Sequence, residues 1–450
     1  MNNPLNGFGA SLRIAFSTLA LACAALPAHA ADTAAANGNG NSNGSGNADA
    51  ALIARGAYLA KAGNCVACHT APRGKPFAGG LPMTTPLGRI YATNITPDPD
   101  TGIGRYTQED FNRAMREGVA KDGHNLYPAM PYPSYAKVND ADMQALYAYF
   151  MHGVTPVRQA NRESDIKWPM NMRWPLKLWN LVFLDKGVYR DKPGKDVAWN
   201  RGAYLIQGLG HCGACHTPRG VAFEEKALDE SGPAFLTGGV LDNWVASNLT
   251  GEHNVGLGRW TEADLTAFLK TGANRHASAY GSMTDVINDS TQALSDADLG
   301  AMATYLKSLP SAGGNGAPPY AYDPQTTKVS LAHPVNDAGA RVYNTYCLQC
   351  HGADGRGFAP MLAPLAGNPT VLTSDPASLV NVTLNGAQDL VIQGVPAPYP
   401  MPKFAGVLSD RQIADVLTFI RAGWNNGAAA VQPEVVAKLR TETADQRQRR

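Results

Sequence analysis

The sequence has almost no net charge and, after its N-terminus, no long apolar run. Its 38 lysines and arginines are balanced by 37 aspartates and glutamates, so the composition gives no sign of the basic surface that binds nucleic acid. The most apolar later run, residues 174–184, has about half of the ~20 residues that a membrane-spanning helix needs. We therefore expect no nucleic-acid partner and a mature chain that does not cross a membrane by itself.

The N-terminal residues have the features of an export signal. Arg13 is their only charge, an apolar stretch follows it, and residues 28–30 (Ala-His-Ala) have the small-x-small pattern of a cleavage site. We predict a signal peptide at 1–30 and a flexible leader at 31–48, because the leader is almost wholly alanine, glycine, asparagine and serine. Cys23 lies inside the signal segment, and its lipidation is left open.

Apart from Cys23, no cysteine lies outside one recurring motif. Cys-x-x-Cys-His occurs three times, whereas the composition alone predicts about 0.002 occurrences. Two thiols three residues apart on a helical turn can form thioethers with the haem vinyl groups, and the adjacent histidine then reaches the iron. We predict three covalent c-type haems, attached at Cys65 and Cys68, at Cys212 and Cys215, and at Cys347 and Cys350, with His69, His216 and His351 as axial ligands.

Three other uses of a Cys-x-x-Cys pair explain the motifs less well. Zinc ribbons use such pairs two at a time, whereas three widely separated motifs leave one unpaired and the histidines unexplained. Thioredoxin-like redox sites need a βαβ context that the sequence does not show. Export permits structural disulfides, which stay the plainest alternative to haem.

The sequence around each motif repeats. Gly56-Ala-Tyr-Leu59 precedes the first motif and Gly202-Ala-Tyr-Leu205 the second, and Ala340-Arg-Val-Tyr343 fills that place before the third. After the first two motifs the match continues, with Asn94-Ile-Thr96 corresponding to Asn248-Leu-Thr250. The first two repeats are therefore the more closely related pair.

Each repeat ends in a segment with helical spacing of its apolar residues. Asn139, Ser295 and Ser409 stand where the N-caps of these closing helices are expected. Helix, haem motif, irregular middle and closing helix together form the layout of a type I cytochrome c, so we predict a mostly α fold of three tandem type I cytochrome c domains. The predicted boundaries are 49–155 (first repeat), 156–197 (a Trp-rich connector), 198–312 (second repeat), 313–332 (a linker), 333–427 (third repeat) and 428–450 (a tail).

Type I cytochromes take their sixth iron ligand from a methionine between the motif and the closing helix. Met130 in Tyr-Pro-Ala-Met-Pro and Met401 in Tyr-Pro-Met-Pro have the proline-flanked setting of such a loop. Met283 is the candidate in the second repeat, although it lacks the prolines, and nearby His276 is kept as its substitute. Three Met ligands would leave no open iron site for a substrate.

The chain resembles the tri-haem cytochrome c subunits of membrane-bound bacterial sugar, sugar-acid and alcohol dehydrogenases over nearly its whole mature length. The resemblance rests on Cys65-Val-Ala-Cys-His-Thr70, Tyr91-Ala-Thr-Asn-Ile-Thr-Pro-Asp98, Tyr127-Pro-Ala-Met-Pro-Tyr132, Trp168-Pro-Met-Asn-Met-Arg-Trp-Pro175 and Gly210-His-Cys-Gly-Ala-Cys-His-Thr-Pro-Arg219.

The resemblance implies a role in electron transfer without catalysis by this chain alone. In that family a separate catalytic subunit carries FAD or pyrroloquinoline quinone (PQQ), and the cytochrome passes its electrons to ubiquinone. It also implies a small third subunit and a place on the periplasmic face of the inner membrane, held peripherally. The chain has no glycine fingerprint for a dinucleotide, as expected if the flavin belongs to another subunit.

Several alternatives stay open at this point. Within the resemblance, the segments 80–83 and 140–147 of the first repeat favour an FAD-dependent, gluconate-type partner over a PQQ-dependent alcohol dehydrogenase. A self-sufficient multihaem oxidoreductase and a free periplasmic carrier are the other possibilities. The connector residues Trp168, Trp174 and Trp179 either pack the first repeat against the second or form a surface for membrane or partner. The substrate and the order of electron flow are not fixed by the sequence.

Overall fold

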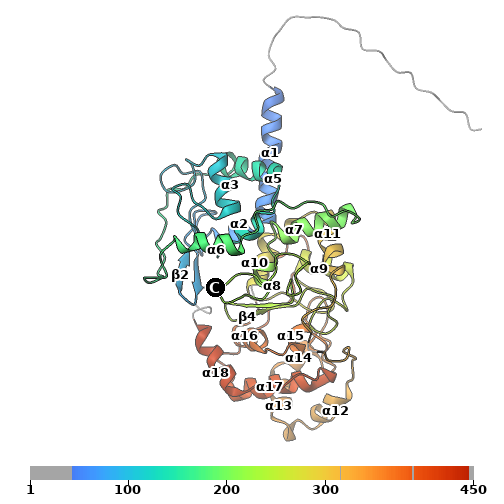
Figure 1. The fold of residues 1–450 in the computed structure, drawn as a ribbon. Coiled ribbons are helices and arrows are strands. Elements are labelled where there is room, and N and C mark those ends of the chain that lie inside the picture. Colours follow the sequence, from blue (N-terminus) through green and yellow to red (C-terminus); the bar gives the residue numbers. More distant parts are fainter. Residues whose placement is uncertain (1–42, 315, 388–389, 445–450) are drawn as a thin grey trace, which may run out of the picture. The chain divides into compact units, whose positions relative to one another are not determined.

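The computed structural model describes residues 43–314, 316–387 and 390–444 (Figure 1). The predicted signal peptide, Cys23 and the leader up to residue 42 lie outside these residues. The first helix, α1 (Asn43–Ala62), begins within the range assigned to the leader and runs into the first repeat.

The fold is mostly helical, as predicted, with two short β-hairpins. In the first repeat, α1 is followed by α2 (Cys65–Cys68), β1 (Pro82–Thr85), β2 (Gly88–Tyr91), α3 (Gln108–Glu117), α4 (Tyr132–Tyr135), α5 (Asp140–Ala148) and the π-helical turn Tyr149–Gly153. The connector contains α6 (Pro175–Phe183).

The second repeat has the same order of helices and strands, with a 3₁₀ turn before its closing helix. It contains α7 (Val197–Gln207), α8 (Gly213–His216), β3 (Gly239–Leu241), β4 (Trp244–Ala246), α9 (Glu262–Thr271), α10 (Ser282–Asp289), the 3₁₀ turn Thr291–Ala293 and α11 (Asp296–Lys307). Each hairpin is antiparallel, with Met83 opposite Ile90 in one and Val240 opposite Val245 in the other.

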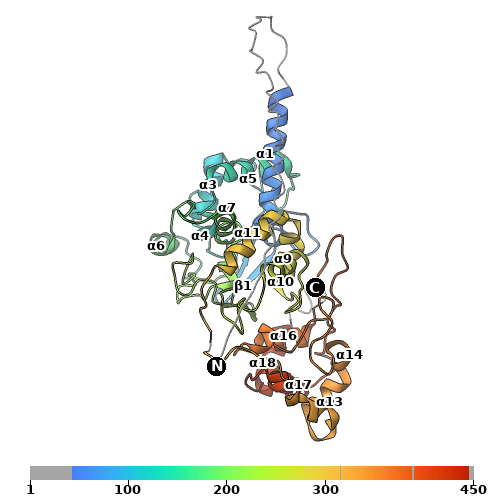
Figure 2. The same ribbon diagram turned by 90° about the vertical axis from the view of Figure 1, so that its right-hand side faces the viewer.

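The third repeat has helices in place of the hairpin. After α12 (Gln325–Ala332) in the linker come the 3₁₀ turn Pro334–Asn336, α13 (Ala338–Tyr346), α14 (Leu348–His351), α15 (Pro369–Leu372), α16 (Ala377–Asn385), α17 (Asp410–Ala422), the 3₁₀ turn Gly423–Asn425 and α18 (Pro433–Glu442). In Figures 1 and 2, α13, α14, α17 and α18 lie together, with α16 facing the second repeat. Helix α18 belongs to the predicted tail, and Val436 and Leu439 bury it against the core of this repeat.

The three closing helices begin as the sequence predicts. The side chains of Asn139, Ser295 and Ser409 each accept a hydrogen bond from a backbone N–H three residues later. Such caps satisfy amide groups that a helix start leaves without a partner. The predicted N-caps of α5, α11 and α17 are therefore confirmed.

In every repeat, the helix before the motif crosses the closing helix at a glycine. A Cβ atom at these glycines would clash with a backbone oxygen of the other helix, so only glycine allows the close approach. The distances from the ideal Cβ to that oxygen are 1.9 Å for Gly56 and Ala145, 2.0 Å for Gly202 and Ala301, and 2.3 Å for Gly339 and Asp415. In the third repeat the crossing glycine directly precedes the predicted segment 340–343.

The first and second repeats share one hydrophobic core, whereas the third has its own. The hydroxyl of Tyr58 donates to Asp298 Oδ2 at 2.5 Å, and the hydroxyl of Tyr204 donates to Asp142 Oδ2 at 2.7 Å. Tyr58 and Tyr204 occupy equivalent positions in the repeats, as do Asp142 and Asp298. The two repeats therefore pair reciprocally, each through its motif-bearing half and its closing helix.

The third repeat packs on the β3–β4 hairpin of the second. The Ser378 hydroxyl accepts a hydrogen bond from the Val245 backbone N–H at 2.7 Å, and Tyr280 and Thr370 are joined through their hydroxyl groups at 2.8 Å. These contacts place α15 and α16 beside the segment that carries Met283.

Candidate haem-binding sites

The three Cys-x-x-Cys-His motifs all form single helical turns, α2, α8 and α14. All six motif cysteines have free thiols in the structure. Burial raises the pKa of Cys65, Cys212 and Cys347 to about 12. These thiols are therefore protonated at neutral pH in the chain without haem.

Each motif histidine is held by a backbone carbonyl in the same way. The Nδ1 atoms of His69, His216 and His351 lie 2.7, 2.6 and 2.9 Å from the carbonyl oxygens of Thr93, Ser247 and Ala363. An Nδ1–H that donates to a carbonyl leaves the Nε2 lone pair for the metal and fixes the plane of the ring.

Burial lowers the pKa of all three histidines. A lowered pKa keeps the imidazole neutral at physiological pH, which is the form that ligates iron. Three separate segments thus each present a neutral imidazole whose ring is held by a backbone carbonyl.

Sequence reasoning missed these carbonyl groups, although a signal for two of them was present. Thr93 and Ser247 directly precede the repeated Asn-x-Thr segments. In each segment the asparagine Oδ1 accepts from the backbone N–H of the threonine two residues later, at 2.9 Å for Asn94 and 2.7 Å for Asn248. Both asparagines are buried. The repeated segment therefore fixes the backbone directly after Thr93 and Ser247, whose carbonyl groups face the motif histidines.

The second repeat contains a mostly apolar cavity of about 340 Å³ at its motif. Cys212, Cys215 and His216 line this cavity, and so does Met283. Two thiols, an imidazole and a thioether around an apolar space form the set of groups that a c-type haem requires. The residues of the second repeat therefore fit the predicted cofactor.

His276, the substitute ligand, is engaged elsewhere. Its ring stacks on Trp260 at a centroid distance of 5.2 Å, and its Nε2 lies 3.4 Å from Asp264 Oδ2. His276 is absent from the residues that line the cavity, whereas Met283 is among them. The local geometry thus favours Met283.

Met130 and Met401 are partly buried against the cores of their repeats. Met130 lies just before α4, where the fully buried Tyr132 fixes the end of its loop. Met401 is held by a pair of backbone hydrogen bonds with Ala387, at 2.9 and 3.1 Å. Both methionines therefore stand on loops with a defined backbone.

The cavity of the second repeat is bordered by the repeats on both sides. Ala67, from the first motif helix, and Thr370, from α15 of the third repeat, contribute to its wall. Helix α10, which carries Met283, packs against α2. The second candidate site is thus in direct contact with the protein around the first and third.

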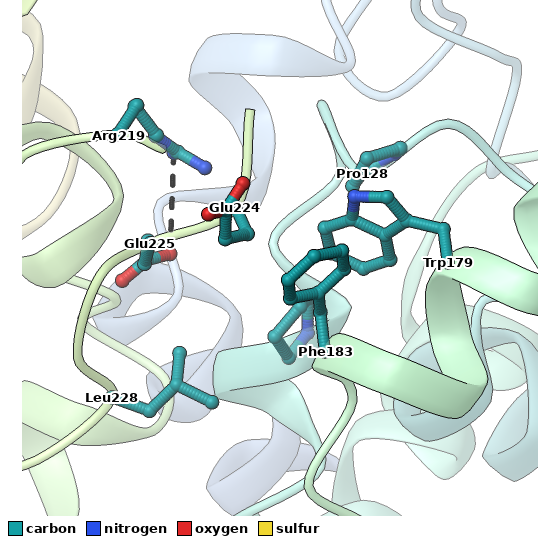
Figure 3. A pocket seen from close by; sticks show the side chains of 8 residues that line it. Pro128, Trp179, Phe183, Arg219, Glu224, Glu225 and Leu228 are labelled. Atoms are coloured by element: carbon teal, nitrogen blue, oxygen red, sulfur yellow. Dashed lines mark ion pairs between the residues drawn. The ribbon is translucent and has the colours of Figure 1, made fainter. Parts of the chain in front are cut away.

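A buried carboxyl group lies behind the second motif. The Glu225 side chain is 5% exposed, and its carboxylate lies 3.9 Å from the Arg219 guanidinium. The positive charges of Arg219 and Lys137 both act to lower its pKa. The Oε2 atom of Glu225 lies against Gly213, and a Cβ atom at position 213 would be only 2.4 Å from that oxygen. Burial raises the pKa of Glu225 to about 7. Glu225, Trp179 and other side chains line a small pocket of about 10 Å³, and Figure 3 shows how these side chains lie.

Comparison with known families identifies cytochrome c domains at both ends of the chain. The family described as "Cytochrome c" matches residues 53–153, and "Cytochrome C oxidase, cbb3-type, subunit III" matches residues 334–420.

Among individual proteins, the chain is 51% identical to the gluconate 2-dehydrogenase cytochrome c subunit of Pantoea cypripedii, over 88% of this chain and 91% of that protein. It is 51% identical to the alcohol dehydrogenase (quinone) cytochrome c subunit of Komagataeibacter europaeus, over 87% and 85%. It is 48% identical to that of Gluconobacter oxydans, over 88% and 84%. The chain therefore belongs to the family of cytochrome c subunits that serve bacterial dehydrogenases such as these.

Proposed function

We propose that this chain is a tri-haem electron-transfer subunit, which accepts electrons from a catalytic dehydrogenase subunit and delivers them to membrane ubiquinone. The observation that carries the proposal is the threefold recurrence of one arrangement: a motif turn, a carbonyl-bound histidine and a glycine at the crossing of the flanking helices. The recurrence supports three type I cytochrome c domains with the predicted boundaries.

The proposed residues divide into attachment and ligation. The motif cysteines attach the haems, and His69, His216 and His351 are the first axial ligands. Met130, Met283 and Met401 are the second axial ligands. Haem, when bound in this way, supplies one-electron chemistry, and Met ligation raises its potential and closes the iron to substrates. The chain itself fixes the plane of each histidine ring through a backbone carbonyl and surrounds the second site with mostly apolar side chains.

We further propose that electrons pass along the chain through the second site. Its cavity wall contains residues of the first motif helix and of α15, whereas the third repeat has a separate core. A relay with the second site in the middle is the order that these contacts support.

We propose an FAD-containing, gluconate-type dehydrogenase as the catalytic partner, together with a small subunit. The relative from Pantoea cypripedii, a gluconate 2-dehydrogenase subunit, supports the gluconate-type partner. The equally similar quinone alcohol dehydrogenase subunit keeps a PQQ-containing partner as the alternative.

We propose a peripheral position on the periplasmic face of the inner membrane. Among the described residues, no helix is both long enough and apolar enough to span a bilayer. The similarity to subunits of alcohol dehydrogenase (quinone) and the predicted signal peptide support this location.

The complex isolated with its own large subunit tests the proposal. Gluconate should reduce the haem absorption bands, and added ubiquinone should then reoxidise them. Reduction by ethanol but not gluconate would replace FAD by PQQ as the partner cofactor. A different result would support the self-sufficient oxidoreductase: no dehydrogenase substrate reduces the haem, and the isolated chain oxidises a substrate by itself.

A further inference from the structure

Helix α6 of the connector has apolar residues on two opposite faces. Trp174, Leu178, Leu181 and Val182 follow the spacing i, i+4, i+7, i+8 and therefore share one face. They are 64, 57, 81 and 71% exposed, and we call these four residues the outer face of α6. A surface helix of a soluble protein normally turns charged or polar side chains to this side.

The opposite face fixes α6 on the protein. Trp179 donates from Nε1 to the carbonyl oxygen of Ala222 at 2.9 Å, and its ring packs edge-on against Tyr132 at 6.1 Å. Asn180 accepts from the Tyr132 hydroxyl at 2.7 Å and donates to the Glu117 carbonyl at 2.9 Å. The helix is thus anchored to the first and second repeats, and the outer face cannot turn inward without breaking these contacts.

The charged side chains within α6 and the stretch just before it are basic, and Asp165 and Asp185 flank this stretch. Residues 166–184 include Lys167, Arg173 and Lys177 and contain no aspartate or glutamate. Both lysines are exposed, whereas the Arg173 guanidinium lies 3.6 Å above the Tyr127 ring. An apolar face beside lysines matches the acyl region and the anionic headgroups of a phospholipid bilayer.

The residues just before α6 add to the same character. Trp168 is 78% exposed and Met170 is 54% exposed. Tryptophan is favoured at the boundary between headgroups and acyl chains. The nine residues of α6 extend only about 14 Å, which is too short to cross a bilayer and suits a helix that lies in its surface.

We propose that the outer face of α6, with Trp168 and Met170, is the surface by which this subunit docks on an anionic phospholipid bilayer. The inference rests on the proposed delivery of electrons to membrane ubiquinone and names the surface involved. The anchored face of α6 touches Tyr132, two residues after Met130, and Ala222, in the loop after the second motif. Docking here brings the lipid surface close to the haem-binding segments of both repeats.

Vesicle sedimentation with the full-length, haem-loaded protein tests the proposal. The protein is mixed with vesicles of phosphatidylcholine and phosphatidylglycerol, or of phosphatidylcholine alone. The double variant Leu181→Ser with Val182→Ser should bind the anionic vesicles at least about tenfold more weakly, because two exposed apolar side chains no longer enter the bilayer. The matched control, Val329→Ser with Val335→Ser, changes residues that are 71 and 77% exposed elsewhere and should bind like the wild type.

The lysines give an independent test. Replacing Lys167 and Lys177 with glutamine should weaken binding to the anionic vesicles by about fivefold per lysine and leave binding to phosphatidylcholine nearly unchanged. Unchanged haem spectra would show that both sets of variants remain folded.

Two outcomes would overturn the inference. In the first, the double variant at Leu181 and Val182 binds vesicles as strongly as the wild type. The membrane anchor then lies elsewhere, for example on a lipid at Cys23. Absence of vesicle binding by the wild type, with loss of the catalytic subunit from the double variant, would make the outer face a protein-docking surface. Reduction of a water-soluble short-chain quinone by the wild-type complex is measured separately. Failure of that reaction contradicts the proposed function, whereas failure of docking leaves it intact.

Discussion

The buried carboxyl group of Glu225 should make the stability of the protein depend on pH around neutrality. Its side chain is 5% exposed, and its one close cation among the described residues, Arg219, lies 3.9 Å away. Burial outweighs the effects of Arg219 and Lys137 and raises the pKa to about 7 from an ordinary value of 4.5. The substitution Glu225→Gln keeps the shape of the side chain and removes its charge at every pH.

The sign and size of the effect follow from proton linkage. Below pH 4.5 the carboxyl group is protonated in both the folded and the unfolded chain, so ionisation costs no stability. Between 4.5 and about 7 the folded state holds a proton that the unfolded state has released, and the free energy of unfolding falls as the pH rises. Above about 7 the loss is complete and amounts to about 3 kcal/mol.

Denaturant titrations of the haem-loaded wild type and of Glu225→Gln, at about pH 5 and about pH 8.5, measure this effect. The difference in free energy of unfolding between variant and wild type should increase by about 2.5 kcal/mol in favour of the variant at the higher pH. Glu163→Gln makes the same chemical change at an exposed position of the connector and serves as the baseline. A difference for Glu225→Gln that does not change with pH would refute the assignment of a buried, weakly compensated carboxyl group.

Three further predictions concern the ligands and the packing. Met401→Ala should lower the reduction potential of the third-repeat haem, measured by potentiometric titration, because a methionine ligand raises it; an unaltered potential would remove Met401 from the ligand set. Met283→Ala should alter the spectrum of the second haem while His276→Ala leaves it unchanged, and the reverse result would reinstate the histidine. Gly202→Ala should destabilise the protein by about 1–3 kcal/mol or more in denaturant titrations, since the new Cβ would lie 2.0 Å from the Ala301 oxygen; wild-type stability would show that α7 and α11 do not cross there.

Local features of the fold could be predicted because each depends on a few neighbouring residues. A serine directly before an aspartate and an apolar run is sufficient to place an N-cap, and Ser295 and Ser409 are confirmed in that role. The motif turns likewise need only the spacing of two cysteines and a histidine, and all three are helical.

Contacts between distant segments could not be predicted in the same way. The hydroxyl of Tyr58 reaches Asp298, 240 positions away, and nothing near either residue records the pairing. The carbonyl group of Ala363 that holds His351 has no side-chain signature at all. The tryptophans of the connector illustrate a different limit. Trp179 packs between the repeats, whereas Trp168 and Trp174 are exposed, and a membrane or partner surface for these two stays a proposal.

The number of haems per chain tests the account most directly. Intact-mass measurement of the exported protein, combined with a pyridine haemochrome assay and an absorption spectrum, gives the haem count and the spin state of the iron together. We predict three covalent haems, all low-spin, on a chain cleaved after Ala30. Fewer than three haem masses, or a five-coordinate high-spin haem in the native protein, would contradict the assignment of three equivalent His/Met sites.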